Sequence, residues 1–569
     1  MLADTLLKEG PYKSIREMVC RIRAMIPQNP LLSELDRNGN VVTYSVKDFY
    51  DNVMNLGDGL IDAGLKGAHI AIMAENSCRY IMADICISSG VGVVVPIDKD
   101  APVQLAAQLL KACDADAVMC DASLVEKLRG IQQLCPRLKT IITMNKPYEG
   151  LPDYDSLCRR GAEIGEDGPY RTLTLDMEAP AKILFTSGTT GPNKGVVLTN
   201  ANLIANLDNC EDTITAESED NTSLSVLPMH HATEINTHIM TRIAGGRLTY
   251  INGNMRNMMK NLSIFKPTVI TVVPMIANAF YKGIWNNAAK SGKDAKLRKG
   301  IKISNLLRKI GIDRTHTMFA EVFAPFGGRL KMIVCGGSML NPEVVKGLND
   351  LGIHLENGYG ITECGPLVSM NSDTLHEHLS VGKICPGLEA KLADVDENGV
   401  GELCVRGKSV FKGYYNDSDA TAAVFDGDGF FRTGDSARID RKTGHVYLVG
   451  RKKNTIVLEN GKNVCPEEIE NTIETNLQYA EEVVVYQAVC ETAGVGRQVL
   501  CAGLYIEDPA LRADRARIKS DIMKTNSLLP SYKALEFIEL PESPYEKTST
   551  RKIKRSSLPA KCSQTGIKI

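Results

Sequence analysis

The chain has 569 residues, a formal net charge of -2 and a hydrophobic content of 43%. This length predicts several domains, and the near-neutral charge argues against a nucleic-acid partner or a disordered acidic chain. The 16 cysteines form no C-x-x-C pair, which favours reduced thiols in the cytoplasm over disulfides or zinc. The N-terminus is too short and charged for a signal peptide, and no apolar run is long enough to span a membrane.

Short apolar runs alternate with helical patterns through the first quarter of the chain. This βαβα rhythm predicts a mostly parallel sheet covered by helices. Residues 145–180 are polar and contain Pro and Gly, so we expect a connector there. The predicted strands are 40–44, 69–74, 91–96, 117–120 and 140–144, and the predicted helices are 45–63, 79–88, 103–112 and 123–128.

A glycine- and hydroxyl-rich loop lies between two apolar runs within residues 183–199, both of which we expect to be strands. Glycines let the backbone N–H groups approach a ligand, and hydroxyls with a lysine complete a cradle for phosphate oxygens. The alternative is a mobile hairpin tip. The spacing does not match a Walker A loop, because Asn193 stands where that motif needs glycine. The cradle consists of Thr186, Ser187, Gly188, Thr189, Thr190, Gly191 and Lys194.

A histidine-rich stretch follows the short strand predicted at 225–228. His231, Glu234 and His238 would share one face of a helix, which is one way to build a metal site. H-E-x-x-H is absent, however, and no cysteine or aspartate completes a ligand set. Lining of a substrate cavity, or polar packing in the core, is the favoured interpretation.

Residues 290–314 carry nine Lys/Arg against two Asp, with Ile301, Ile303, Leu306, Leu307 and Ile310 interleaved among them. This composition is typical of a helix that lies weakly on an anionic membrane surface. The favoured alternative is a solvated helix face.

Two glycine-bearing segments then follow predicted strands. Gly336 and Gly337 come after the strand at 330–335, and a helix is expected from Asn341, with proline at its first position. Residues 357–365 follow the strand at 353–356, at the strand end where α/β sheets bind ligands. Its glycines and Tyr359 would pack against a flat base, while Thr362 and Glu363 would reach phosphate and Mg²⁺.

The sequence becomes β-rich from residue 401 and changes again near 453. Asp435 follows a Thr-Gly turn, where a carboxylate can accept both hydroxyls of a ribose. We expect a large domain over residues 1–452, of mixed α/β sheets with a β-rich subdomain. A small mobile α+β domain is expected over 453–569, and its basic segment 545–555 would fold over a polyphosphate.

Together these motifs resemble the adenylate-forming superfamily of acyl-CoA synthetases, peptide-synthetase adenylation domains and luciferases. The resemblance covers about residues 40–556, in family order, and is strongest to bacterial long-chain fatty acyl-CoA ligases. It implies Lys552, Thr362, Glu363 and His231 as catalytic residues, Glu363 as the Mg²⁺ ligand and Lys453 as the hinge. Residues implied to bind the nucleotide are the cradle Thr186–Gly191 with Lys194, then Gly336, Gly337, Asn357, Gly358, Tyr359, Gly360, Asp435 and Arg451. Around Lys552 the chain departs from the family pattern, with Glu546 for proline and Arg551 for glycine.

The resemblance implies two half-reactions on ATP, Mg²⁺ and a small carboxylic acid. The acid first forms acyl-AMP with release of pyrophosphate, and a thiol then takes the acyl group. Ala232 replaces the aspartate that holds an amino acid's ammonium in relatives, which argues against an amino acid as substrate. Residues 228–231 and 457–464 are most similar to bacterial long-chain fatty acyl-CoA ligases, so the resemblance favours an aliphatic acid. Coenzyme A is the expected thiol. An acyl-AMP ligase that loads a carrier protein and a non-enzymatic nucleotide-binding relative are the alternatives.

Overall fold

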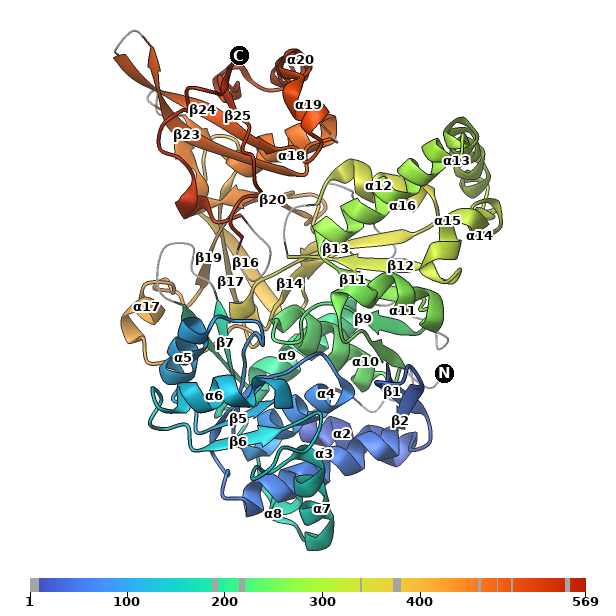
Figure 1. Cartoon of the computed structure of the whole chain (residues 1–569), viewed down its shortest axis with the longest axis vertical. Helices are drawn as coiled ribbons and strands as arrows, with labels where there is room; N and C mark the ends of the chain where they lie inside the picture. Colours follow the sequence, from blue (N-terminus) through green and yellow to red (C-terminus); the bar gives the residue numbers. More distant parts are fainter. Residues whose placement is uncertain are drawn as a thin grey trace.

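The computed structural model of the protein describes residues 10–186, 193–213, 221–337, 340–371, 380–458, 462–477, 479–492, 495–547 and 553–569. Figure 1 shows a large lower body, built from the first four fifths of the chain, and a smaller C-terminal unit above it. Within the described residues, no helix is both long and apolar enough to cross a membrane.

A seven-stranded sheet contains the predicted strands at 69–74, 91–96, 117–120 and 140–144 and the hairpin around the cradle, whereas the predicted strand at 40–44 lies in a second sheet. Its order is β18-β8-β7-β4-β3-β5-β6, and β3, β4, β5 and β6 pair in parallel as expected. The hairpin β7–β8 is antiparallel, with Thr186 opposite Lys194 at its tip. The strands are β3 (His69–Met73), β4 (Val93–Pro96), β5 (Ala117–Cys120), β6 (Thr140–Thr143), β7 (Pro180–Thr186), β8 (Lys194–Thr199) and β18 (Gly413–Tyr414).

A nine-stranded sheet supplies the second half of the site, in the order β15-β14-β13-β12-β11-β9-β10-β1-β2. Its inner strands are parallel, so the carboxyl ends of β11, β12 and β13 lie along one edge. The strands are β1 (Pro30–Leu35), β2 (Val41–Ser45), β9 (Ser223–Ser225), β10 (Thr249–Ile251), β11 (Val269–Val272), β12 (Met332–Cys335), β13 (His354–Gly360), β14 (Leu367–Met370) and β15 (Lys383–Ile384).

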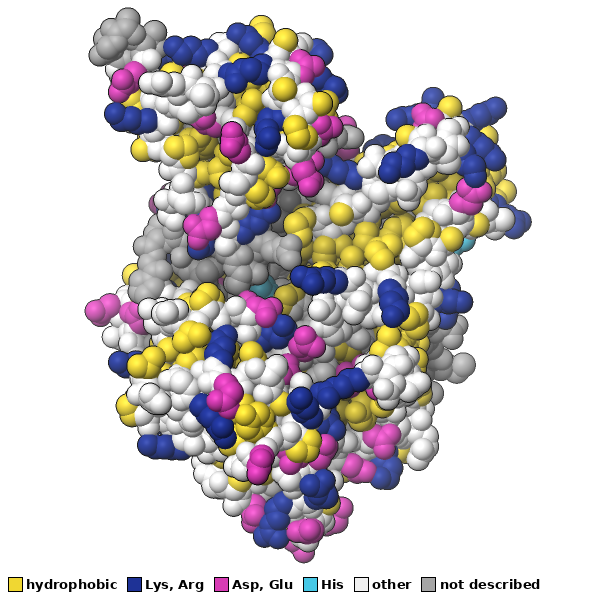
Figure 2. Space-filling model, viewed as in Figure 1, with side chains coloured by type: hydrophobic (Ala, Val, Ile, Leu, Met, Phe, Trp, Pro, Cys, Tyr) yellow, Lys and Arg dark blue, Asp and Glu magenta, His cyan; other side chains and the backbone are white. Residues whose placement is uncertain are grey.

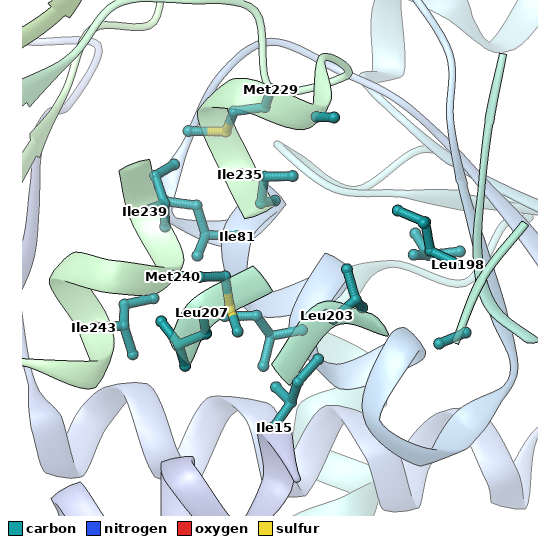
Figure 3. Close-up of a cluster of buried hydrophobic side chains, with 14 of the residues drawn as sticks. Ile15, Ile81, Leu198, Leu203, Leu207, Met229, Ile235, Ile239, Met240 and Ile243 are labelled. Carbon is teal, nitrogen blue, oxygen red and sulfur yellow. The ribbon is translucent and has the colours of Figure 1, made fainter. Parts of the chain in front are cut away.

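One hydrophobic core lies between these two sheets and joins them. Figure 3 shows side chains from α2 (Ile15–Met25), α4 (Cys78–Cys86), β8, α9 (Asn200–Thr213), the π-helix η3 (Thr233–Ile239) and α10 (Met240–Ala244) gathered together. All of the labelled residues belong to a single buried cluster. The labelled residues are Ile15, Ile81, Leu198, Leu203, Leu207, Met229, Ile235, Ile239, Met240 and Ile243.

The predicted connector at 145–180 is wrong in one respect, because it contains the helix α7 (Tyr154–Ile164). This helix packs on α3 (Val46–Asp62) through glycines on both helices. A Cβ added to Gly161 would lie 1.8 Å from Asn55 O, and one added to Gly59 would lie 2.1 Å from Leu157 O. Only glycine permits this backbone contact, which a search for apolar periodicity does not detect.

The β-rich subdomain is the four-stranded antiparallel sheet β16-β17-β19-β20. It begins somewhat before the predicted residue 401, with β16. The strands are β16 (Leu388–Ala393), β17 (Gly401–Gly407), β19 (Phe431–Ile439) and β20 (Val446–Arg451). Register places Asp435 of β19 opposite Arg451 of β20.

The C-terminal unit is built on the sheet β23-β24-β25-β26, preceded by the short pair β21–β22. One face is covered by α18 and α20, and these helices and the sheet enclose a core of their own. The other face packs against Tyr545, Ile553, Leu558 and Cys562. The elements are β21 (Ile456–Val457), β22 (Asn463–Val464), α18 (Pro466–Asn476), β23 (Glu482–Thr492), β24 (Val495–Tyr505), α20 (Arg515–Asn526), β25 (Phe537–Glu539) and β26 (Ile567–Lys568).

Candidate functional site

The two ends of the predicted phosphate cradle lie opposite each other at the tip of the β7–β8 hairpin. Ser187, Gly188, Thr189, Thr190 and Gly191 lie outside the described residues. The ammonium of Lys194 lies 4.7 Å from the ring centroid of Tyr414. Tyr414 is brought there by β18, which pairs with β8. A cation–π contact of this kind holds the lysine beside the loop.

Glu363 lies next to the same tyrosine, in the short 3₁₀ turn η6 (Thr362–Cys364). Its Oε1 accepts a hydrogen bond from the Tyr414 hydroxyl at 3.0 Å. Burial raises the pKa of Glu363, with Asp435 adding to the rise, while the Tyr414 hydrogen bond and Arg451 oppose it. A bound divalent cation would favour the ionised form. The carboxylate, with the Thr362 hydroxyl beside it in sequence, therefore fits the oxygen donors that Mg²⁺ prefers.

Asp435 is the centre of a buried polar cluster. The Tyr359 hydroxyl donates to Asp435 Oδ2 at 2.6 Å, and Arg451 Nε lies 2.7 Å from Oδ1. Asp435 is 6% exposed, and its own N–H donates to Thr433 Oγ1 at 3.1 Å. A carboxylate oxygen can accept more than one hydrogen bond. The cluster therefore fits the two hydroxyls of a ribose.

The glycines predicted to face the base lie at the ends of β12 and β13. Residues 357–360, expected as a loop, instead continue β13 and pair with β14, because Tyr359 and its neighbours find antiparallel partners there. A Cβ on Gly336 would lie 3.1 Å from Gly358 O, so the two strand ends approach closely. Gly337 has a φ of +94°, a backbone conformation that favours glycine. Gly360 has no space for a side chain either, since an added Cβ would lie 2.6 Å from Pro366 O.

Asn357 adds a polar group to this edge of the sheet. Its amide nitrogen donates to Ser380 O at 3.4 Å, whereas its Oδ1 is buried and has no hydrogen-bond partner in the described part of the protein. A buried acceptor without a donor is costly unless a ligand supplies one. This atom therefore fits an amino group on the base.

His231 begins the segment that leads into the π-helix η3 and is partly buried. The alternative metal triad is not supported by the packing. His238 Nδ1 lies 3.0 Å from Glu234 Oε1, and both side chains are buried in the protein interior. Across the described ranges, no group of three or more His, Cys, Asp or Glu side chains is arranged to hold a metal.

Lys453 occupies the turn η7 (Lys452–Asn454), directly after β20. Burial and the neighbouring Arg451 lower the pKa of Lys453, and Asp435 and Glu363 oppose that effect. The charge of Lys453 therefore interacts with the charges of Arg451, Asp435 and Glu363. The next residue, Asn454, donates from its amide to Glu467 Oε1 of α18 at 2.6 Å.

Lys552 and Arg551 lie outside the described residues, but the chain on both sides of them is anchored. Before the loop, the Tyr545 N–H donates to Glu482 Oε2 at 2.8 Å. After it, Arg555 Nη2 lies 2.6 Å from Glu470 Oε1 and 3.6 Å from Glu467 Oε1. Burial raises the pKa of Glu470 to about 7, and Arg555 opposes the rise.

Glu546, the departure from the family's proline, forms an ion pair with Lys554. The residue thus has a structural partner at the base of the Lys552 segment. The Lys554 N–H also donates to Glu546 O at 2.8 Å, so the two ends of the segment are held together by backbone and side chain.

Four residues of this arrangement were missed by sequence reasoning: Tyr414, Glu467, Glu470 and Arg555. Tyr414 comes from a two-residue strand without a motif, and the two glutamates follow a helix-initiating proline that signals only a helix start. Arg555 lies within the predicted basic segment, which was the one available signal.

The fold and the clustered residues define a class: a nucleotide-binding protein with its site at the strand ends of an α/β body. Comparison with known families gives the particular assignment. The chain belongs to the AMP-binding enzyme family, because the sequence model of that family matches residues 26–415. The resemblance predicted from the motifs is therefore confirmed.

Two curated relatives and one solved structure illustrate the similarity. The chain is 30% identical over 451 residues to "Long chain acyl-CoA synthetase 6, peroxisomal" of Arabidopsis thaliana, covering 73% of this chain and 62% of the relative. It is 28% identical over 495 residues to human "Long-chain-fatty-acid--CoA ligase 6", covering 82% of this chain and 69% of the relative. The A-PCP didomain of a carboxylic acid reductase from Segniliparus rugosus, in complex with AMP, shares the fold with a TM-score of 0.78 at 18% identity, covering 98% of this chain and 81% of that one.

Proposed function

We propose that this protein is an AMP-forming ligase that joins a fatty acid to coenzyme A. The observation that carries the proposal is the continuous set of contacts from Lys194 through Tyr414 to Glu363, beside the cluster of Asp435, Tyr359 and Arg451. It provides, side by side, groups suited to phosphate, a divalent cation and ribose. The choice of a fatty acid as the acid and coenzyme A as the thiol follows the names of the two relatives.

In the first half-reaction, a carboxylate oxygen of the acid attacks the α-phosphorus of ATP. The bond from that phosphorus to the pyrophosphate oxygen breaks, giving acyl-AMP and pyrophosphate. Two anions must meet, so the site needs fixed positive charge where negative charge develops. Lys194 and Lys552 supply it from the protein, and Asp435 holds the ribose. Mg²⁺, bound through Glu363 with Thr362 nearby, would neutralise charge on the phosphate oxygens.

In the second half-reaction, the sulfur of coenzyme A attacks the acyl carbonyl carbon and AMP leaves. Lys453 lies where the large domain ends, and we propose it as the hinge about which residues 453–569 turn between the two steps. His231 is proposed to border the acid, and Ala232 beside it offers no charge for an amino group.

Loading of a carrier protein is the second candidate function, and a nucleotide-binding relative without activity is the third. We also propose a cytoplasmic location, supported by sixteen cysteines that are all free. The Arabidopsis relative's printed name places that protein in peroxisomes. A weak contact with a membrane surface through residues 290–314 completes the proposal.

ATP–pyrophosphate exchange with a panel of acids tests the first half-reaction. Saturated aliphatic acids should exchange faster than benzoate or amino acids, with a ladder in chain length, because each buried methylene contributes about 0.8 kcal/mol. Adding coenzyme A should convert exchange into net thioester formation. A flat ladder would contradict the aliphatic assignment, and exchange without any thioester would favour the carrier-protein alternative.

A further inference from the structure

The helix α13 (Asp294–Lys309) projects at the edge of the large body, at the upper right of Figure 1. Its inner face is fixed by packing. Leu297 and Ile301 pack against a core cluster, Ser304 is buried, and Arg308 Nη1 donates to Asn349 O at 2.9 Å. Because these contacts fix the rotation of the helix, they also determine which side chains face outward.

The outward face carries a row of aliphatic side chains. Ile303 is 45% exposed, Leu306 is 66% exposed and Ile310, just after the helix, is 68% exposed. Their spacing of three and four residues places them one above the other on the helix. A contiguous row of exposed large aliphatic residues is unusual on a surface that faces only water.

Four lysines flank this row: Lys296, Lys299, Lys302 and Lys309. All four are exposed, and none forms an ion pair among the residues that the structure describes, although Lys296 lies near enough to Glu321 to help lower the pKa of that carboxyl. At 3.6 residues per turn, the lysines and the aliphatic row fall within an arc of roughly 140°. Lys293, which lies before the helix, instead pairs with Glu321 at 2.7 Å. Figure 2 shows dark blue and yellow side chains gathered over these projecting helices.

We propose that this face, which we name the α13 face, docks on the surface of an anionic phospholipid membrane. Aliphatic side chains rimmed by lysines suit the boundary between acyl chains and negatively charged headgroups. Lysine stems can lie along the apolar row while the ammonium groups reach phosphates. The inference deepens the proposed function, since a membrane is where a poorly soluble fatty acid accumulates.

The chain contains a natural reporter for this docking. Its single tryptophan, Trp285, lies in the neighbouring helix α12 (Pro274–Lys290). The guanidinium of Arg298 in α13 lies 4.5 Å from the ring centroid of Trp285. Docking of α13 should therefore change the tryptophan emission without any added label.

The test is sedimentation of the full chain with vesicles, in the absence of ATP and acid. Phosphatidylcholine vesicles are compared with vesicles that also contain phosphatidylglycerol. One variant replaces the aliphatic row (I303S, L306S, I310S), and another replaces the lysines (K296Q, K299Q, K302Q, K309Q). Matched controls change equally exposed residues elsewhere: L134S, V395S and L528S for the aliphatic set, and K66Q, K111Q, K139Q and K146Q for the lysines.

We expect the parent and both controls to bind the anionic vesicles, with a change in Trp285 emission, and to bind neutral vesicles far more weakly. Replacing the lysines should reduce partitioning by roughly 600-fold, since each of the four lysines near an anionic surface contributes about fivefold. Replacing the aliphatic row should reduce it about tenfold or more. Added salt should weaken binding of the parent.

Three outcomes would overturn the proposal. The first is equal binding of the parent to both vesicle types, and the second is an equal loss of vesicle binding in the control variants. The third is a parent dimer in solution that the I303S/L306S/I310S variant dissociates, because a second copy of the chain would then cover the α13 face. Exchange activity with a water-soluble short acid, measured without vesicles, should be unchanged in every variant. If the parent lacks exchange but binds vesicles, the proposed function fails while the docking surface stands.

Discussion

The nucleotide side and the lysine side of the site are built in different ways. On the nucleotide side, Asp435 lies in a continuous sheet and is held by Tyr359 and Arg451 within 2.7 Å, all inside the large body. On the lysine side, the segment that bears Lys552 is anchored within the C-terminal unit, through Glu470 and Glu482.

Few described polar contacts join these two sides. One of them runs from Asn341 Nδ2, at the start of α16 (Pro342–Asp350) in the large body, to Thr475 Oγ1 of α18 at 2.9 Å. This hydrogen bond is partly buried and joins two neutral groups, and a bond of this kind contributes only about 1 kcal/mol. We therefore expect the proposed nucleotide site to be preorganised and the placement of Lys552 to depend on contacts that can break and re-form.

Lys552→Ala should have the largest effect. Acyl-AMP formation should fall by about a thousandfold or more, because the fixed positive charge matters only while the bond to the α-phosphate forms. Thioester formation from supplied acyl-AMP should be retained. Pre-steady-state measurement of each half-reaction gives the answer, and equal losses in both would rule out this role.

Lys453→Pro should have the next largest effect, on the opposite step. Proline fixes φ and removes the N–H, so it should trap one orientation of the C-terminal unit. We expect thioester formation to fall about a hundredfold while adenylation is largely preserved. Lys453→Ala serves as the control for the loss of charge alone. Parent-like rates in both steps would place the hinge elsewhere.

Glu363 should make adenylation depend on pH and Mg²⁺ together. Its pKa is raised by burial, so protonation should weaken Mg²⁺ binding at a higher pH than an ordinary carboxyl would. Below that pKa, the apparent Mg²⁺ affinity should fall about tenfold per pH unit, and excess Mg²⁺ should move the acidic limb to lower pH. Chelation of Mg²⁺ should abolish exchange. If the acidic limb of the pH profile of exchange does not move with the Mg²⁺ concentration, Glu363 is not the Mg²⁺ ligand.

Arg555→Lys should have the smallest effect of the four. Lysine keeps the charge but lacks the planar fork whose two separate nitrogens donate to Glu470 Oε1 and to Val485 O. The Lys552 segment should be positioned less well, lowering adenylation about five- to tenfold with little change in thioester formation from acyl-AMP. Lys561→Arg, at an exposed ion pair of the same unit, is the matched control. An equal decrease in both steps would indicate a general loss of stability instead.

Sequence reasoning succeeded where local chemistry decides the structure. Apolar runs predicted β7 and β8, and Asn341 with its following proline predicted the start of α16, where the Asn341 side chain accepts from the Glu343 N–H. It failed where tertiary contacts decide. Helix α7 depends on the fit of Gly161 against α3, and β13 extends to Gly360 because β14 pairs with it.

The same distinction holds for the candidate site. Motifs indicated Glu363, Asp435 and Arg451, but not Tyr414, which reaches Glu363 only because β18 pairs with β8. A pairing between residues more than two hundred positions apart leaves no local pattern to find. The role of Glu467 is likewise visible only once α18 lies against the hinge turn.

The central claim is that the nucleotide site is complete without Lys552. Direct titration of AMP into the parent, Lys552→Ala and Asp435→Asn, by calorimetry, tests it. The account predicts parent-like affinity in Lys552→Ala and a loss of about tenfold or more in Asp435→Asn, whose amide cannot accept from both Arg451 and the ribose. A large loss of AMP affinity in Lys552→Ala, with Asp435→Asn unaffected, would contradict it.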